Sequence, residues 1–327
     1  MPFIGLLETL THKISILNGY DSESNTLNLP DHSRFYYSPG YMVIIAALAR
    51  KNGVGINGII YPDQLHKDYA EAVGITKAIW GKDTYEQVRI NDGRNYSQLI
   101  HLDNEDATDK ASAAINGCIR NFFPTGVHNN FVNELCDLVG DLHSNVWAHG
   151  MDSGFSMAQK NKVPNTDDFC LEFALADTGM GFLSELNRVG NEINNDKDAI
   201  NWCIQEGHST KKHKSTDEWA QTMPDDIIDN PLRGIETTKR ADNSHHMGLG
   251  LFKLIELVKK FNGELRISSG DSVYLLNPNG AESYISAINH WKGVAISCKF
   301  NTGHINDAVE TAMDLDVQNV LDQLRRT

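Results

Sequence analysis

The chain has 327 residues and a formal net charge of −14, with 40% hydrophobic and 22% charged residues. This length predicts about two domains of roughly 100–200 residues each, and the composition is that of a globular protein with a sizeable core. The acidic balance argues against non-specific nucleic-acid binding, which needs a basic surface.

The cysteines and the apolar runs of the sequence indicate the cellular compartment of the protein. The five cysteines are scattered and include no C-x-x-C pair, so they suggest neither a disulfide framework nor a zinc site. We expect reduced thiols in a cytoplasmic protein. The N-terminus MPFIGLLETLTHK lacks a basic leader and a cleavage site, so no signal peptide is expected. The longest apolar run, from Tyr41 to Ala49, is far short of the ~20 residues of a membrane helix.

The first hundred residues alternate between strand and helix patterns. The predicted elements are strands at Leu27–Leu29 and Arg34–Tyr37, a helix from Ser38-Pro39 to Asn52-Gly53, a strand at Val54–Tyr61 and a helix from Pro62-Asp63 to Gly74. Serine and proline are typical of a helix start, and Asn-Gly is typical of its end. This β-α-β-α order predicts a small α/β domain.

The segment FYYSPGYMVIIAALARKNG resembles the STAS-type anti-sigma-factor antagonist fold. In that family a strand runs into a serine-containing turn, a helix and another strand. The resemblance covers roughly residues 1–100. The family's phosphorylated serine precedes the turn glycine, but here Pro39 precedes Gly40 and has no hydroxyl. Ser38 is left either as a substitute phosphoacceptor or, the favoured interpretation, as a plain helix N-cap.

The middle of the chain suggests a junction between two domains. Asn91–Asp109 is polar and reads as a linker, Lys110–Phe123 is a helical run, and Thr125-Gly126 marks a break. We therefore predict a STAS-like α/β domain at 1–105, a helical connector at 106–126 and a second domain at 127–302. The tail, 303–327, has helical spacing and is expected to dock on the body or on a partner.

The segment FVNELCDLVGDLHSNVWAHG, residues 131–150, predicts an amphipathic helix. Asp141 and Asn145 lie one turn apart on one of its faces. An amide oxygen can ligate a hard cation without adding charge, and a carboxylate one turn away can orient water or accept a proton. The pair suits magnesium–triphosphate chemistry, although a solvated helix face gives the same pattern.

The segment CLEFALADTGMGF, residues 170–182, places Asp177 at the end of an apolar strand, followed by Gly179 and Gly181. Such a carboxylate can accept from an exocyclic amine such as that of adenine, and glycines let the backbone approach a ring. A plain loop remains the alternative.

In HHMGLGLFKLIELVKKFNGELRISSG, residues 245–270, Gly248, Leu249 and Gly250 precede an amphipathic helix, Leu251–Phe261. Free N–H groups at a helix start favour phosphate. A strand, Glu264–Ser268, follows.

In this order the three segments resemble the N box and the two glycine boxes of the GHKL ATPases, the family of gyrase, histidine kinases and MutL. The resemblance covers roughly residues 127–302, with Gly293–Phe300 in the place of the closing strand. It implies the GHKL (Bergerat) α/β sandwich, with a mixed, mainly antiparallel sheet and helices on one face. ATP would lie between the helices, under a flexible lid at about 182–247.

The resemblance also implies roles for individual residues. Asn145 corresponds to the magnesium-binding asparagine, and Asp141 lies where hydrolysing members carry a glutamate base. Asp177 corresponds to the adenine-reading aspartate, with Gly179 and Gly181 shaping the base pocket. The backbone of residues 248–250 would line the phosphates.

The sequence departs from the family pattern at several positions. Asp141 is one methylene shorter than glutamate, so hydrolysis is expected to be slow. His246 replaces a common lid glycine, and Val294 replaces a threonine that helps to hold adenine. In the lid, Lys239 or Arg240 either reaches phosphate or is simply solvated. A metal site is a further alternative for four lid histidines: His208, His213, His245 and His246.

Three functions remain open at this stage. Only about 25 residues follow the closing strand and no histidine-bearing hairpin precedes the pocket, so the chain resembles the stand-alone type, similar to anti-sigma-factor serine kinases of bacteria. The first hypothesis is a magnesium-dependent ATPase or serine/threonine protein kinase. The second is a non-hydrolysing ATP-gated switch, and the third is a subunit of a stress or phage-defence complex. All three hypotheses imply partner proteins, and the family resemblance also implies that the chain forms a homodimer.

Overall fold

The computed structural model describes residues 3–11, 16–31, 36–123, 126, 128–150, 153–208 and 250–311. The helices are α1 (Leu6–Thr11), η1 (Ile16–Asn18), α2 (Pro39–Lys51), α3 (Gln64–Ala72), α4 (Ile75–Trp80), α5 (Glu105–Phe122), α6 (Asn129–Gly150), α7 (Gly181–Arg188), α8 (Asp196–Cys203) and α9 (Gly250–Lys260). The strands are β1 (Phe3–Ile4), β2 (Tyr20–Asp21), β3 (Thr26–Asn28), β4 (Tyr36–Tyr37), β5 (Ile59–Ile60), β6 (Ile100–Leu102), β7 (Gly154–Lys162), β8 (Phe169–Asp177), β9 (Glu264–Leu276) and β10 (Glu282–Asn301). Residues 302–311 are also helical. The chain is therefore of the expected mixed α/β class.

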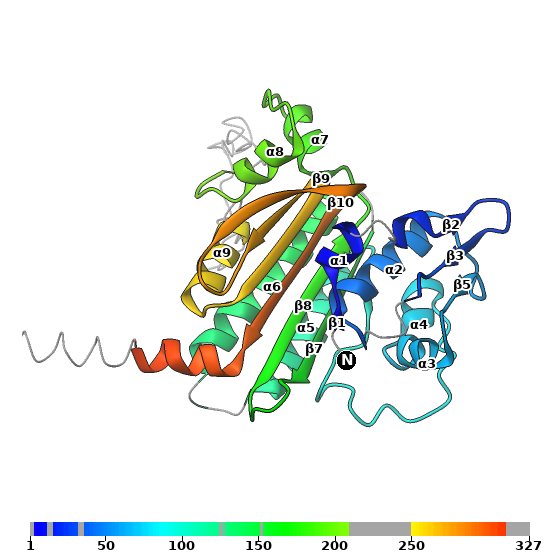
Figure 1. Ribbon diagram of the computed structural model, residues 1–327, viewed down its shortest axis with the longest axis horizontal. Coiled ribbons are helices and arrows are strands. Elements are labelled where there is room, and N and C mark those ends of the chain that lie inside the picture. Colours follow the sequence, from blue (N-terminus) through cyan, green and yellow to red (C-terminus); the bar gives the residue numbers. More distant parts are fainter. Residues whose placement is uncertain are drawn as a thin grey trace, which may run out of the picture.

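A five-stranded sheet forms the centre of the molecule, in the order β6-β7-β8-β10-β9 (Figure 1). Every neighbouring pair in it is antiparallel, so it contains none of the parallel pairing that a mixed sheet would have. Gly154 of β7 is paired with Asp177 of β8. On the other side of β8, Ala176 is paired with Ala295 of β10. The end of β8 thus lies between the start of β7 and the middle of β10.

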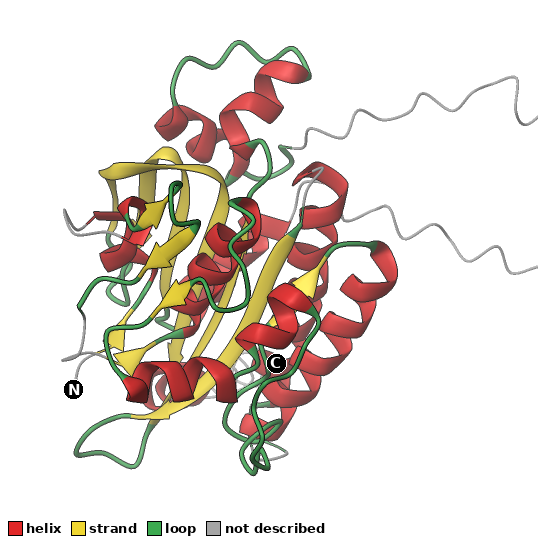
Figure 2. Ribbon diagram, turned by 90° about the vertical axis from the view of Figure 1, so that its right-hand side faces the viewer, coloured by secondary structure: helices red, strands yellow, loops and turns green. Residues whose placement is uncertain are grey.

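The helices α5, α6 and α9 cover one face of this sheet, behind the strands in Figure 1. Figure 2 shows the same layers from the side. The apolar positions predicted for α6 are buried, including Leu135, Leu138, Leu142 and Val146. Phe131, also on α6, makes edge-to-face ring contacts with Phe261 and Phe300. This helical layer and the sheet therefore share one apolar core.

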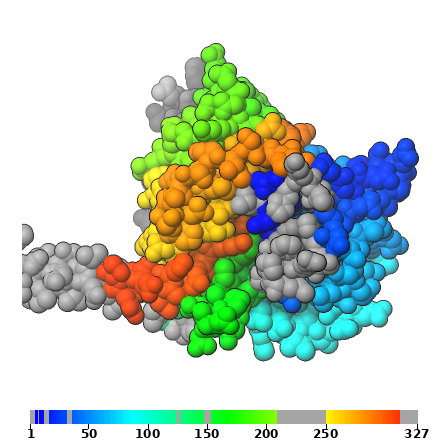
Figure 3. Space-filling model, in the orientation of Figure 1, coloured from blue at the N-terminus to red at the C-terminus, as the bar shows by residue number. Residues whose placement is uncertain are grey.

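The opposite face of the sheet is covered by α1 and α2, which the resemblance did not lead us to expect. All residues of α2 from Pro39 to Ala49 are buried, and they pack with sheet residues such as Phe155 and Ala174. Figure 3 shows the N-terminal region, in blue, beside the orange strands β9 and β10. Strands that are apolar on both faces need cover on both, and β7 and β8 supply side chains to both cores.

A buried carboxylate joins α2 to the sheet. Glu172 of β8 is 2% exposed, and its Oε1 accepts from Ser38 Oγ at 2.9 Å, Gly40 N at 3.0 Å and Ser297 Oγ at 3.0 Å. Lys299 Nζ lies 3.7 Å from its Oε2. Ser38 occupies the N-cap position, but its side chain makes no capping bond to α2. The expected side-chain cap is therefore wrong, because Glu172 accepts from the start of α2 in its place.

The N-terminal region contains two small sheets of its own. β2, β3 and β5 form one, with β2–β3 antiparallel and β3–β5 parallel, and β1 pairs with β4. The strand expected over Val54–Tyr61 is only Ile59–Ile60. Gly58 N donates to Gly55 O at 2.8 Å, so the chain turns there before the strand begins.

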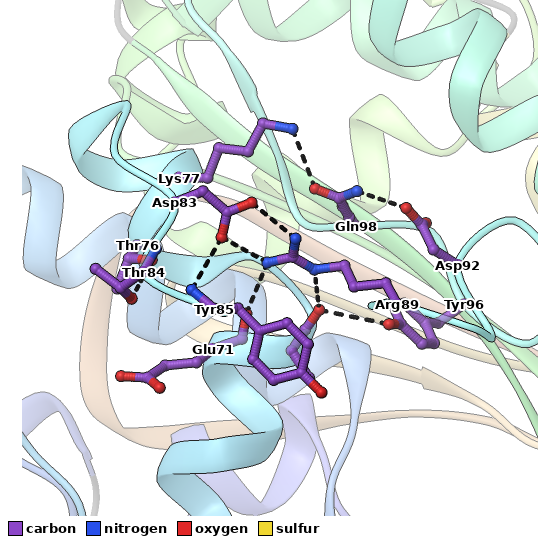
Figure 4. Close-up of polar contacts among 11 residues, drawn as sticks. Glu71, Thr76, Lys77, Asp83, Thr84, Tyr85, Arg89, Asp92, Tyr96 and Gln98 are labelled. Carbon is purple, nitrogen blue, oxygen red and sulfur yellow. Dashed lines mark hydrogen bonds and ion pairs between the residues drawn. The ribbon is translucent and has the colours of Figure 1, made fainter. Parts of the chain in front are cut away.

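Arg89 anchors the long segment between α4 and β6 (Figure 4). Its guanidinium donates to both carboxylate oxygens of Asp83 at 2.7 Å. It also donates to Ala72 O at 2.7 Å and Glu71 O at 3.1 Å, at the end of α3. The Arg89 guanidinium lowers the pKa of the Asp83 carboxyl by donating hydrogen bonds to it. One partly exposed fork therefore holds this segment against α3.

The predicted polar linker, Asn91–Asp109, contains β6 and the start of α5. β6 pairs with β7 at the edge of the central sheet, and Asn104 Oδ1 caps α5 by accepting from Ala107 N at 2.9 Å. α5 then packs against α6. β6 is thus a strand of the central sheet, and α5 belongs to the helical layer that covers it. The domain boundaries at 105 and 126 stay a prediction. None of the helices in the described ranges has the length and apolar composition needed to cross a membrane.

Candidate functional site

The start of α9 lies against the face of α6 that carries the predicted metal-binding pair. A Cβ placed on Gly250, the first residue of α9, would lie 3.6 Å from Asn145 Nδ2 and 3.6 Å from Asp141 Cβ. Gly250 is buried, and Asp141 and Asn145 are half-buried. At the other end of α9, Lys260 pairs with Glu134 of α6 at 2.7 Å. The structure therefore brings together Asp141, Asn145 and Gly250, although Asn145 and Gly250 are 105 positions apart in the sequence.

Asp177 ends β8 and is buried, with 6% of its surface exposed. Its Oδ1 accepts from Gly179 N at 2.8 Å and from Val294 N at 3.2 Å. One carboxylate oxygen thus shapes the turn that follows β8 and ties this turn to β10. Val294, noted as a departure from the family pattern, contributes through its backbone rather than through a side-chain hydroxyl.

Gly154 connects the two groups of predicted residues. It pairs with Asp177 across β7 and β8. A Cβ placed on it would lie 2.8 Å from Val146 Cγ1 and 3.4 Å from Asp177 Cβ. Val146 follows Asn145 directly on α6, so the end of β8 adjoins the same part of α6 that faces Gly250. The three predicted segments therefore meet at one end of the sheet.

Two glycines are required by close backbone approaches in this region. Gly181 begins α7 with φ +76°, and a Cβ there would lie 2.5 Å from Lys292 O. A Cβ on Gly293 would lie 2.2 Å from Asp177 O. The sequence reasoning named Gly181 but used Gly293 only to mark the closing strand. A glycine inside a strand pattern often marks such an approach, and this signal could have found it.

Part of the predicted site lies outside the described residues. This holds for Gly248 and Leu249 and for the lid residues named above: Lys239, Arg240, His213, His245 and His246. The described part of the predicted lid contains α7 and α8. His208 follows α8, where its Nδ1 lies 2.9 Å from Trp202 O and its ring packs on the Trp202 ring.

His143 is a buried histidine that the sequence reasoning passed over. It is fully buried on α6, two residues before Asn145. Its Nδ1 lies 2.9 Å from Ser112 Oγ, and its Nε2 lies 2.8 Å from Ser156 Oγ. Ser156 in turn donates to Ala174 O at 3.2 Å. Burial lowers the pKa of His143 to about 3, so the ring is neutral at pH 7.

Asp196, Asp271 and His290 form a second polar cluster, beside α8 and the β9–β10 hairpin. His290 Nδ1 lies 2.9 Å from Asp271 Oδ1, and Asp196 Oδ2 accepts from Asp271 N at 2.9 Å. These contacts account for the arrangement without a ligand.

The fold and the site together define a mixed α/β protein in which three separated segments converge at one end of an antiparallel sheet. Comparison of the chain with family models, curated proteins and solved structures gives no match.

Proposed function

We propose that this chain is an ATP-binding regulatory protein of the histidine-kinase-like ATPase type, which hydrolyses ATP or transfers phosphate to a partner protein. The observation that carries the proposal is the convergence of Asp141 and Asn145 with Gly250, next to the strand end that carries Asp177. These residue types come from three segments of the sequence, and each suits a different part of a magnesium nucleotide.

The close approach of α9 to α6 supports a cation–triphosphate in this place. A Cβ on Gly250 would be in van der Waals contact with Asn145 and Asp141, so the start of α9 lies directly beside both side chains. Rotation of the amide can turn the Asn145 oxygen toward a magnesium ion, for which oxygen ligands are preferred. When bound, magnesium would neutralise phosphate charge. The N–H groups at the start of α9 would donate to the phosphate oxygens.

Asp141 and Asp177 would have different tasks. Asp141, one turn before Asn145, would accept a proton from water or from a serine or threonine hydroxyl of a partner. Asp177 holds the backbone with Oδ1, and its carboxylate would also accept from the exocyclic amine of adenine. This division makes Asp177 both a structural residue of the turn and the group that distinguishes adenine.

A non-hydrolysing ATP-gated switch is the second candidate. The observation that favours it is the position of Gly181, which begins α7 and lies against the backbone of β10. A bound nucleotide that displaced the turn after Asp177 would therefore also displace α7 and the part of the protein surface that α7 forms.

The test measures ATP binding and phosphate release side by side on purified protein with magnesium. Asp177→Asn keeps an acceptor oxygen for the two backbone N–H groups but loses the charge, so ATP affinity should fall about 10- to 100-fold. Asp141→Asn should leave affinity unchanged and slow phosphate release by at least ~100-fold. Asp137→Asn is the matched control, because Asp137 is an exposed aspartate one turn earlier on α6.

The outcomes separate the candidates. Release that is lost in Asp141→Asn alone supports the enzyme and directs the search to a phosphorylated partner. Binding without release in the wild type supports the switch. If wild-type protein binds no adenine nucleotide, the proposal is wrong and the converging segments serve only as a scaffold.

A further inference from the structure

A cavity of about 260 Å³ lies on the side of the sheet that the N-terminal region covers. Residues of β2 and of the end of α2 line one side of it, including Tyr20 and Lys51. The other side is formed by Thr178 and by His290–Gly293 of β10. The helices α5, α6 and α9 cover the opposite face of the sheet, so this cavity is separate from the space beside Gly250.

The lining of the cavity is basic although the chain carries a formal net charge of −14. It includes Lys51, His290 and Lys292, and it includes no aspartate or glutamate. Lys292 is exposed and has no ion-pair partner among the described residues. Lys51 and Lys292 bring two positive charges to one cavity, and His290 lies beside them with its Nδ1 2.9 Å from Asp271 Oδ1. Such a concave surface favours an anion, because it concentrates positive potential.

Trp291 gives a second, independent indication of a ligand. This residue lines the cavity, is 3% exposed, and its Nε1–H has no hydrogen-bond partner in the described part of the chain. Buried N–H groups are nearly always paired, because an unpaired one costs about 1–3 kcal/mol. The Nε1 atom is itself inaccessible, so an acceptor atom of a bound molecule would satisfy this donor once the ring turns toward the cavity.

We propose that this cavity binds a small organic anion that carries a phosphate group. The two lysines and His290 would contact the phosphate, and the rings of Tyr20 and Trp291 would pack on the organic part. The cavity is smaller than the roughly 300–1,000 Å³ of typical ligand pockets, so the ligand has the size of a sugar phosphate. Inorganic phosphate would make the same contacts with the basic side chains, but it would leave the rings of Tyr20 and Trp291 uncovered.

The cavity wall also contacts the turn that carries Asp177. Lys292 O would lie 2.5 Å from a Cβ on Gly181, and a Cβ on Gly293 would lie 2.2 Å from Asp177 O. A ligand that shifts residues 291–293 must therefore shift this turn. On this basis binding of the anion regulates the affinity for ATP. This regulation rests on the proposed function, whereas the anion site itself does not rest on it.

Ribose 5-phosphate is the probe, titrated calorimetrically into the full chain without nucleotide, with ribose and inorganic phosphate run beside it. We expect ribose 5-phosphate to bind more tightly than either, and Lys292→Gln or Lys51→Gln to weaken it at least ~10-fold, since each removes about 1.4 kcal/mol or more. Lys162→Gln is the control, because Lys162 is an exposed lysine at the end of β7. Unfolding temperatures verify that each variant is folded.

Three results would overturn the anion site. The first is no heat of binding up to millimolar ribose 5-phosphate, and the second is equal affinity in Lys292→Gln and wild type. The third is loss of binding in Asn145→Ala, because it would place the probe at the proposed nucleotide site. A second titration measures ATP affinity with ribose 5-phosphate at saturation. A changed affinity supports the regulation and an unchanged one overturns it. Failure of ATP to bind at all concerns the proposed function and leaves the first titration intact.

Discussion

His143 shows how a single residue positions the face of α6 that carries Asp141 and Asn145. The neutral ring bridges Ser112 of α5 and Ser156 of β7, and so ties α6 to a neighbouring helix and to the sheet. Each hydroxyl also has a backbone carbonyl as a partner, Thr108 O for Ser112 and Ala174 O for Ser156. Protonation would put a positive charge on this buried ring, and burial disfavours the charged form of a histidine.

The buried His143 predicts a component of acid destabilisation. The unfolded chain takes up a proton at His143 below about pH 6.5, whereas the folded chain does so only near pH 3. Stability therefore falls as the pH drops through this window and is constant above it. Between pH 6.5 and 5.5 the loss should be about 1 kcal/mol. Urea unfolding at pH 7.5, 6.5 and 5.5 measures it.

His143→Gln provides the comparison for this titration. Glutamine does not ionise, so the variant should be less stable at pH 7.5 but should lose this part of the slope. Equal slopes in the variant and the wild type would show that other groups cause the acid destabilisation.

Local order in the sequence was enough to place Asp177 at the end of a strand, because it follows an apolar run and precedes two spaced glycines. Its role in a site stays a prediction. The capping role of Ser38 was predicted wrongly, because its partner Glu172 is 134 residues away in the chain. No local pattern reveals such a partner.

At the scale of elements, α6 contains a glycine that no contact explains. Gly140 lies inside the helix, and a Cβ placed on it would have nothing within 4 Å. Glycine in a helix interior is less favourable than alanine by about 0.8–1.0 kcal/mol. Gly140→Ala should therefore stabilise the protein by about 0.5–1 kcal/mol and leave ATP binding unchanged.

Gly293→Ala is the informative contrast to Gly140→Ala. The added methyl group would meet the backbone of Asp177 at 2.2 Å, and such overpacking costs about 1–3 kcal/mol. Thermal unfolding of both variants checks the pair. If Gly140→Ala instead lost stability, α6 would need glycine at this position for a reason other than the space around a Cβ atom.

The long amphipathic helices were predictable, and some strands were not. α6 and α9 were found from their apolar spacing, and their ends differ from the prediction by only a few residues. β7 (GFSMAQKNK) was missed because its polar residues hide a buried strand. Ser156 can be buried there because His143 and Ala174 satisfy its hydroxyl. β9 and β10 are longer than expected, since each continues beyond the short apolar run that was recognised.

At the scale of the molecule, Glu172 joins α2 to the central sheet. Glu172→Ala would remove the acceptor from Ser38 Oγ, Gly40 N and Ser297 Oγ and the partner from Lys299. Breaking such a buried charged group typically costs about 3–5 kcal/mol. The nearby Glu172 charge raises the pKa of Lys299. We therefore expect a large loss in the free energy of unfolding, measured in urea.

Glu264→Gln is the matched control for Glu172→Ala. Glu264 also pairs with Lys299, at 3.9 Å, but it is partly exposed, and such pairs contribute about 0–1 kcal/mol. A cost below about 1 kcal/mol for Glu172→Ala would contradict its role as the link between α2 and the sheet.

The burial of α2 against β7 and β8 has a consequence for synthesis of the chain on the ribosome. α2 leaves the ribosome well before the strands that cover its apolar surface. At ~5–20 residues per second, the roughly 120 residues from the end of α2 to β8 take about 6–24 s to make. During that interval eleven successive residues, Pro39 to Ala49, lack their final neighbours in the sheet. The nascent chain is therefore a natural client for a ribosome-associated chaperone.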